Sequence, residues 1–165
     1  IRYLHTLTNK MMETTNISVI LHSIALANLA VDGELDFFDH SVHLSLQQRK
    51  RCLQYILELC TQRENFNVKL VYGCLVADFQ YAETQCIFLS DTICYVRLHT
   101  ENRKNNLAVF HHPDMKIIFL RFFEHMWSKK RKVIREETEE ICAFIQEAIQ
   151  RVDILDRASK EKETD

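Results

Sequence analysis

The amino-acid sequence predicts an α/β fold: one layered domain with a central sheet of about five strands flanked by helices, and a long amphipathic helix near the C-terminal end. Three observations favour this class. A chain of 165 residues has the length of one domain. Only two glycines and one proline interrupt it, which favours long helices. Apolar β-branched runs alternate with segments of helical periodicity, as expected where helices and strands form layers.

The first third of the chain predicts a helix, a strand and a second helix. Residues 1–13 repeat apolar side chains every three or four positions, so we expect a short connecting helix there. The run NISVILHS that follows is β-branched and apolar, which predicts a buried strand. Residues 24–30 predict a short helix, with a turn at Asp32-Gly33.

The clearest helical pattern covers residues 45–62. Ser45 is a suitable N-cap, and Gln48, three residues later, completes a capping box. The strand VKLVYG follows after a polar loop. One apolar stripe runs along the helix and consists of Leu46, Leu53, Ile56, Leu57 and Cys60.

The second half of the chain predicts three strands and two helices. The strands cover 84–89, 92–99 and 107–111, and the helices cover 113–128 and 134–157. We expect the helix at 113–128 to bury one apolar and aromatic face, made of Ile118, Phe119, Phe122, Phe123, Met126 and Trp127.

We expect one domain over residues 1–165, with the α/β core at 14–128, because no internal repeat or low-complexity linker divides the chain. The sequence begins at Ile1 rather than at methionine, which favours a fragment of a longer protein.

Composition excludes several classes of function. A net charge of −2 argues against a domain whose main task is to bind DNA or RNA. The six cysteines form no C-x-x-C pair and lie mostly in apolar stretches, so a reduced cytoplasmic protein is favoured over a disulfide scaffold, although their even number leaves that alternative open. There is no apolar run near 18 residues and no signal peptide, so we expect neither a membrane span nor secretion.

The run His111-His112-Pro113-Asp114 has two interpretations. Proline suits the first position of a helix, an acidic residue suits the first turn, and a residue before proline is extended. These features favour a helix start. The alternative is a metal site that His40 and His43 would complete if that pair lies on a helix. Neighbouring histidines on a strand point to opposite faces, so His111 and His112 are not expected to chelate one ion together. We expect no metal and no cofactor.

The last helix carries an apolar stripe spaced by three and four residues. Packing onto its own domain is favoured, and a self-association seam that makes a homodimer is the alternative. The stripe consists of Ile141, Phe144, Ile145, Ala148, Ile149 and Val152.

Two basic clusters, residues 49–51 and residues 129–132 with Arg135, are interpreted as solvated helix faces. The second could instead contact DNA phosphate in a larger assembly or an acidic partner.

Between residues 45 and 127 the order of elements resembles a known family. The segments QRKRCLQYILELC, FNVKLVYG, CIFLSDTICYVRL and HHPDMKIIFLRFFEHMW follow one another as in the non-catalytic phospholipase D-like domains of bacterial helix-turn-helix transcription regulators. Phe119, Phe122, Phe123 and Trp127 match the aromatic helix of that family. Catalytic members require a histidine with lysine two residues later, and none of the eight histidines here has one. The resemblance therefore implies a sensor or dimerisation domain without phosphodiesterase activity.

The function that we expect is a non-enzymatic regulatory domain, which senses an effector, dimerises, or does both. Ligands of open α/β sheets bind at strand ends. Arg97 is the first candidate, because an arginine within the apolar run ICYVRLH needs an anionic partner if it faces inward, although an outward orientation is favoured. The candidate ligand-binding residues are Arg97, His22, Tyr72, His99 and His112.

The expected partners are a second copy of the chain and either a small-molecule effector or another protein. DNA would be bound only through a domain missing from this chain. A metal-assisted enzyme using His40, His43, His111 or His112 and a purely structural oligomerisation module remain the alternatives.

Overall fold

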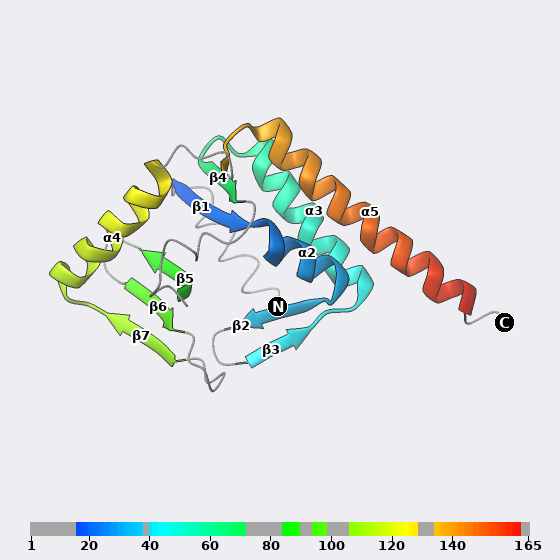
Figure 1. The fold of residues 1–165 in the computed structure, drawn as a ribbon, viewed down its shortest axis with the longest axis horizontal. Helices are drawn as coiled ribbons and strands as arrows, with labels where there is room; N and C mark the ends of the chain where they lie inside the picture. Colours follow the sequence, from blue (N-terminus) through cyan, green and yellow to red (C-terminus); the bar gives the residue numbers. More distant parts are fainter. Residues whose placement is uncertain are drawn as a thin grey trace. The chain divides into compact units, whose positions relative to one another are not determined.

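The computed structural model describes residues 16–37, 40–71, 84–89, 94–98, 106–128 and 134–162 (Figure 1). The chain divides into two compact units. Unit 1 combines residues 1–33, 44–73 and 132–165, and unit 2 combines residues 34–43 and 74–131. The connecting helix expected at residues 1–13 lies outside the described residues.

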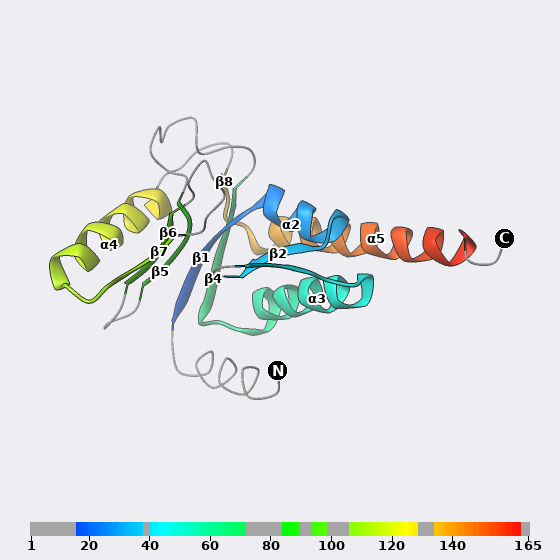
Figure 2. The same ribbon diagram turned by 90° about the horizontal axis from the view of Figure 1, so that it is seen from below.

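Unit 1 contains a three-stranded sheet in the order β1-β4-β8. Strand β1 (Ile17–His22) pairs in parallel with β4 (Phe66–Val71), and β4 pairs antiparallel with the short β8 (Ile134–Arg135). Helices α2 (Ser23–Val31), α3 (Leu46–Gln62) and α5 (Thr138–Lys162) lie on the same side of this sheet (Figure 2). The crossover from β1 to β4 follows the rule that parallel strands need a helical connection.

Unit 2 contains a hairpin and a second antiparallel sheet. The hairpin pairs β2 (Glu34–Phe37) with β3 (His40–His43). The sheet has the order β5-β6-β7, with β5 at Thr84–Leu89, β6 at Cys94–Leu98 and β7 at Asn106–Phe110. Helix α4 (Pro113–Ser128) contacts β5 and β6, and the rings of Phe110 and Phe119 stack with centroids 5.6 Å apart.

The coarse α/β class is confirmed, but the single central sheet of about five strands is wrong. In the described part of the chain the strands belong to three separate sheets of three, two and three strands. The physical reason is local pairing: the strands between residues 84 and 110 pair with their sequence neighbours as an antiparallel sheet, not with β1 and β4. Glu34–Phe37 and His40–His43, for which the sequence predicts no strand, pair as β2 and β3.

Helix boundaries follow local signals. Helix α3 begins after Ser45, whose Oγ accepts the N–H of Gln48 at 3.4 Å, while Oε1 of Gln48 accepts the N–H of Ser45 at 2.9 Å, so the predicted capping box is confirmed. Helix α5 begins at Thr138 and not near residue 134, because residues 134–135 pair with β4. No helix in the described ranges is long and apolar enough to cross a membrane.

The core of unit 1 lies between the sheet and its three helices. The predicted stripe of α5 belongs to it: Ile145 is fully buried, and Phe144 and Ile149 pack against the same cluster. These side chains therefore pack as the favoured interpretation expects, against the core of their own unit. The core cluster consists of Leu26, Leu29, Ala30, Leu53, Leu70, Ile141, Ile145, Ala148 and Val152.

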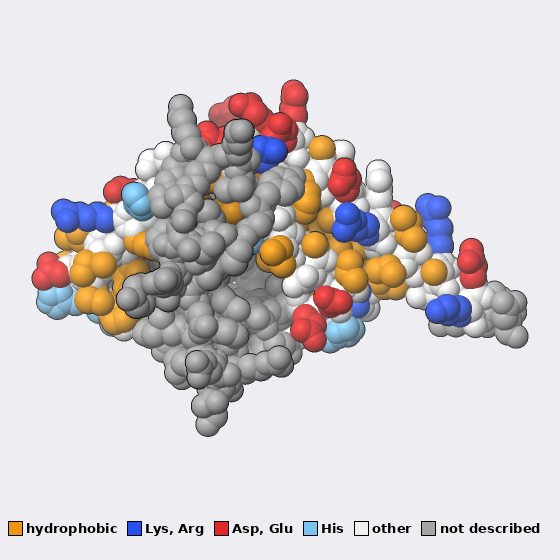
Figure 3. Space-filling view, viewed as in Figure 1, with side chains coloured by type: hydrophobic (Ala, Val, Ile, Leu, Met, Phe, Trp, Pro, Cys, Tyr) orange, Lys and Arg blue, Asp and Glu red, His pale blue; other side chains and the backbone are white. Residues whose placement is uncertain are grey.

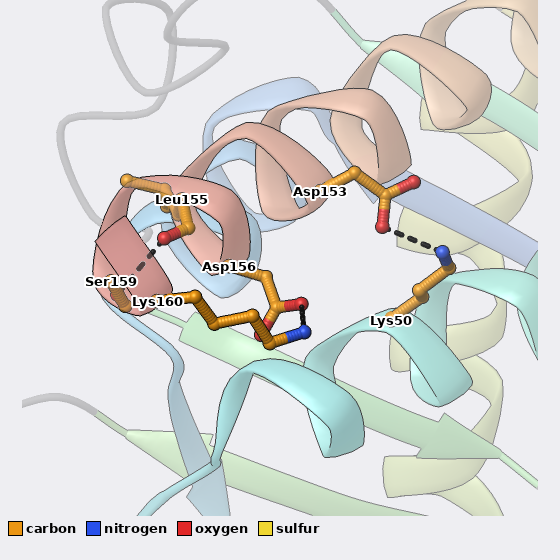
Figure 4. Close-up of polar contacts among 6 residues, drawn as sticks. All are labelled: Lys50, Asp153, Leu155, Asp156, Ser159 and Lys160. Atoms are coloured by element: carbon orange, nitrogen blue, oxygen red, sulfur yellow. Dashed lines mark hydrogen bonds and ion pairs between the residues drawn. The ribbon is translucent and has the colours of Figure 1, made fainter. Parts of the chain in front are cut away.

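Helices α3 and α5 carry two ion pairs and a side-chain hydrogen bond, which Figure 4 shows. Nζ of Lys50 lies 2.6 Å from Oδ1 of Asp153 and joins α3 to α5. Within α5, Lys160 pairs with Asp156, one helical turn earlier, and the Ser159 hydroxyl donates to the carbonyl of Leu155.

Arg49 corrects the prediction that the first basic cluster is a solvated face. Its side chain is only 7% exposed. Nε donates to the carbonyl of Leu44 at 2.9 Å, and Nη1 donates to the carbonyls of Val31 at 2.6 Å and Ala30 at 3.4 Å. The guanidinium thus satisfies carbonyl groups at the C-terminal end of α2, where the helix dipole also favours a positive charge.

Gly33 makes room for this arginine. Its φ of 71° is in the left-handed region, which glycine adopts without steric cost. A Cβ atom at this position would overlap the Arg49 guanidinium. The carbonyl of Gly33 also accepts the N–H of Leu44 at 2.8 Å, so the two ends of the 34–43 segment are held side by side.

Arg49→Leu is expected to lower the free energy of unfolding by about 2–4 kcal/mol, because buried carbonyls of α2 and of Leu44 lose their donor. Arg51→Leu is the matched control: it removes the same charge from an exposed position on the same helix. Urea unfolding followed by far-ultraviolet circular dichroism measures both. Equal losses in the two variants would contradict the structural role of Arg49.

Candidate functional site

The sequence-predicted ligand residues are distributed over both compact units. His22 belongs to unit 1, whereas Arg97 and His112 belong to unit 2. Tyr72 and His99 lie outside the described residues. The predicted ligand set is therefore divided between two compact units.

His22 ends β1 and occupies the N-cap position of α2, with no hydrogen bond from its side chain to the helix. More than a third of the residue is exposed. Desolvation by the surrounding protein nevertheless lowers the pKa of its imidazole from the usual 6.5, so the neutral ring is favoured. A neutral imidazole at a strand end can accept or donate a hydrogen bond to a ligand.

Arg97 lies on β6, the central strand of the unit 2 sheet. In the backbone register it is opposite Cys86 on β5 and Leu107 on β7. Because β6 is paired on both sides, its backbone hydrogen-bonding groups are engaged by β5 and β7.

His112 is the N-cap of α4, which answers whether the His-His-Pro-Asp run is a site or a helix start. Its carbonyl accepts the N–H of Lys116 at 3.2 Å, the first hydrogen bond of the helix. Its Nδ1 accepts the N–H of Asp114 at 3.3 Å, so the imidazole fills the place that a serine or aspartate usually takes. Pro113 is the first helical residue, as predicted.

The buried face of α4 differs from the prediction in one respect. Phe119, Phe122, Phe123 and Trp127 are partly buried, but Ile118 is 58% exposed. The spacing explains this, because residues 119, 122, 123 and 127 recur every three or four positions and Ile118 falls beside their face. The side chain of Met126 is not among those described.

The premise of the metal-site alternative is wrong. His40 and His43 lie on strand β3 and not on a helix. Residues three apart on a strand point to opposite faces, so the pair cannot chelate one ion as helical neighbours would. Within the described ranges no group of three or more His, Cys, Asp or Glu side chains is placed to hold a metal ion.

A small hollow lies where the last turn of α3 meets the first turn of α5. Its volume of about 20 Å³ is enough for one water molecule and too small for an organic effector. It is lined by Cys60, Phe66, Val68, Thr138 and Ile141.

The outer face of α2 is the strongest candidate surface in unit 1. The helix has the sequence SIALANLAV and buries Ser23, Leu26, Leu29 and Ala30. Its other side exposes Ile24 at 53% and Val31 at 48%, two helical turns apart on the same face. We name this pair, with Asn28 between them, the α2 face. Hydrophobic side chains are visible among the charged ones on the surface of unit 1 (Figure 3).

The sequence of α2 itself indicates that this face is unusual. A surface helix normally has one polar side, yet α2 contains only two polar residues. A helix that is apolar all round is expected to be covered on all sides. Leaving one side open is therefore typical of a contact surface.

Comparison with known proteins identifies no relative of the chain. No protein-family model matches the chain, and neither a curated protein nor a solved structure matches it. The likeness to phospholipase D-like regulatory domains therefore remains an expectation from the sequence pattern.

Removing the imidazole cap is expected to weaken unit 2. His112→Ala should lower the free energy of unfolding of unit 2 by about 1 kcal/mol. His112→Asn should retain most of the stability, because the asparagine side chain also accepts a hydrogen bond from a backbone N–H of the first turn. Fluorescence of Trp127, the chain's only tryptophan and part of α4, reports on unit 2 during urea unfolding. His111→Ala, at the neighbouring exposed position, is the control, and a loss equal to that of His112→Ala would contradict the capping role.

His22 is expected to make stability depend on pH. Because its pKa is lowered in the folded protein, the unfolded chain binds the proton more readily. Its contribution to stability is complete above pH 6.5, the usual pKa, and is lost as the pH falls through the folded pKa. Between about pH 7.5 and about pH 5.5 the wild type should lose more stability than His22→Gln in urea titrations. Parallel losses would show that His22 does not contribute.

Proposed function

We propose that the chain is a non-enzymatic regulatory domain that dimerises through the α2 face, as part of a cytoplasmic transcription regulator whose DNA-binding part lies outside this chain. The exposed apolar side of α2 is the observation that carries the proposal. Resemblance to the phospholipase D-like regulatory domains supplies the regulatory context.

Burial of the α2 face would be favourable for two copies. Fully burying a valine or isoleucine side chain contributes about 1.5–3 kcal/mol, and Ile24 and Val31 each have about half of this still to gain. In a two-fold symmetric contact the same patch is buried on both protomers, so each residue counts twice. Asn28, between them, could pair across the axis through its amide group.

The α5 stripe is a less suitable seam than the α2 face. Ile141, Ile145, Ala148 and Val152 are all at most 4% exposed and contact their own unit. Dimerisation through them would first require α5 to leave α3, which exposes the core. A contact that uses α2 needs no such rearrangement.

Effector sensing is the second part of the regulatory proposal. An anionic effector would be recognised by Arg97, because a guanidinium binds carboxylate or phosphate in a bidentate manner. Lysine cannot form the two parallel hydrogen bonds of a guanidinium, so Arg97→Lys would weaken the binding of an effector that Arg97 holds in this way.

Ile24→Glu is expected to convert a dimer of the purified chain into a monomer, because it places two charges in the contact. Size-exclusion chromatography with light scattering measures the mass. Ile118→Glu is the matched control: Ile118 is a similarly exposed isoleucine, at 58%, on α4 of unit 2. A wild type that is monomeric at every concentration, or equal effects of the two substitutions, would overturn dimerisation through α2.

A further inference from the structure

Helices α3 and α5 pack antiparallel, so that the end of α3 lies beside the start of α5 (Figures 1 and 2). The ion pair between Lys50 and Asp153, with Nζ and Oδ1 2.6 Å apart, shows which parts of the two helices lie at the same level. This register determines which side chains of the two helices lie at the same level.

The register places two cysteines at one level. Cys60 follows Lys50 by ten residues, and Cys142 precedes Asp153 by eleven. With a rise of about 1.5 Å per residue, these steps cover about 15 Å and about 16.5 Å, so the two residues differ in level by only about 1.5 Å.

Cys60 lies on the side of α3 that faces the start of α5. Cys60 packs against the core cluster and lines the small hollow together with Thr138 and Ile141, the residues of α5 around Cys142. Packed helices have axes about 8–10 Å apart and Cα atoms about 2.3 Å from each axis, so directly facing Cα atoms are about 3.4–5.4 Å apart, which overlaps the range of about 4.4–6.8 Å that a disulfide requires. Both thiols are free in the structure.

The electrostatics of the thiols agree with this proximity. Burial and, to a smaller extent, the charge of Cys142 raise the pKa of Cys60 to about 11. Burial also raises the pKa of Cys142 and of Cys52. The Cys142 thiolate thus acts on the pKa of Cys60, whereas burial alone raises the pKa of Cys52.

We propose that Cys60 and Cys142 are an oxidisable thiol pair, which a small-molecule disulfide converts into a disulfide that staples α5 to α3. This modification site goes beyond the proposed regulatory function and does not depend on it. The two cysteines enclose more than eighty residues of chain, so the bond would restrict the unfolded state strongly.

The reaction balances as a thiol–disulfide exchange. The thiolate of Cys142 attacks one sulfur of the small-molecule disulfide, forms a mixed disulfide and releases one small thiolate. The thiolate of Cys60 then attacks the Cys142 sulfur and releases the second. Both protein thiols lose a proton, the two released thiolates take up protons from solvent, and the protein is oxidised by two electrons while the small disulfide is reduced by two.

The raised pKa values predict slow reaction near neutral pH and faster reaction in alkaline solution, because only the thiolate attacks. The rate should therefore rise with pH up to about 11, where Cys60 ionises. A cysteine that the oxidant cannot reach would show no such dependence of the oxidation rate on pH.

The test uses the full chain, reduced and then incubated with glutathione disulfide. After an acid quench and alkylation, peptide mass spectrometry identifies the linked cysteines, and intact mass reports the loss of two hydrogens. We expect the Cys60 and Cys142 peptides to be joined, and the melting temperature to rise by roughly 10 °C relative to the reduced protein.

Cys60→Ala and Cys142→Ala should each abolish the link, and Cys52→Ala, on the same helix as Cys60, should retain it. Circular dichroism shows whether each variant folds. If one does not, the peptide analysis of the wild type alone still tests which cysteines are linked. Glutathione adducts on both cysteines without a link, a different pairing among the six cysteines, or a link that leaves the melting temperature unchanged would each overturn the proposal.

Discussion

The antiparallel contact of α5 with α3 is the interaction on which unit 1 depends. A three-stranded sheet in which β8 has only two residues has little stability of its own. The fully buried side chains Leu53 of α3 and Ile145 of α5 instead supply the centre of the core, with α2 packed beside them. Each such side chain stabilises the fold by about 1.5–3 kcal/mol, more than the solvated ion pair at the rim.

Features specified by neighbouring residues could be predicted from the sequence. Ser45 and Gln48 predict the start of α3, and Pro113 predicts the start of α4, because caps and proline act within one helical turn. The strands at residues 17–22 and 84–89 follow from their β-branched and apolar runs. These signals do not depend on what the element later contacts.

Features specified by distant residues could not be predicted in this way. Strand pairing is one, because the pattern of β5, β6 and β7 is compatible with a shared sheet or a separate one. Arg49 is another: its spacing from Leu46 and Leu53 places it on the apolar stripe, but only the carbonyls of α2, nearly twenty residues earlier, explain why a charge is buried there. The candidate site was obscured similarly, since exposure of Ile24 and Val31 is known only once the packing side of α2 is known.

The discontinuity of unit 1 has a consequence for synthesis on the ribosome. Helix α5 contributes four of the nine residues of the core cluster, and it is made after everything else in that unit. While residues 74–131 are being translated, α2, α3 and the β1–β4 pair have no third helix to cover them. Local elements can form early, but closure of this core must wait for contacts of large sequence separation, which slows folding and leaves apolar surface open in the meantime. A chaperone that binds nascent apolar segments would therefore find its longest-lived target in the first half of this chain.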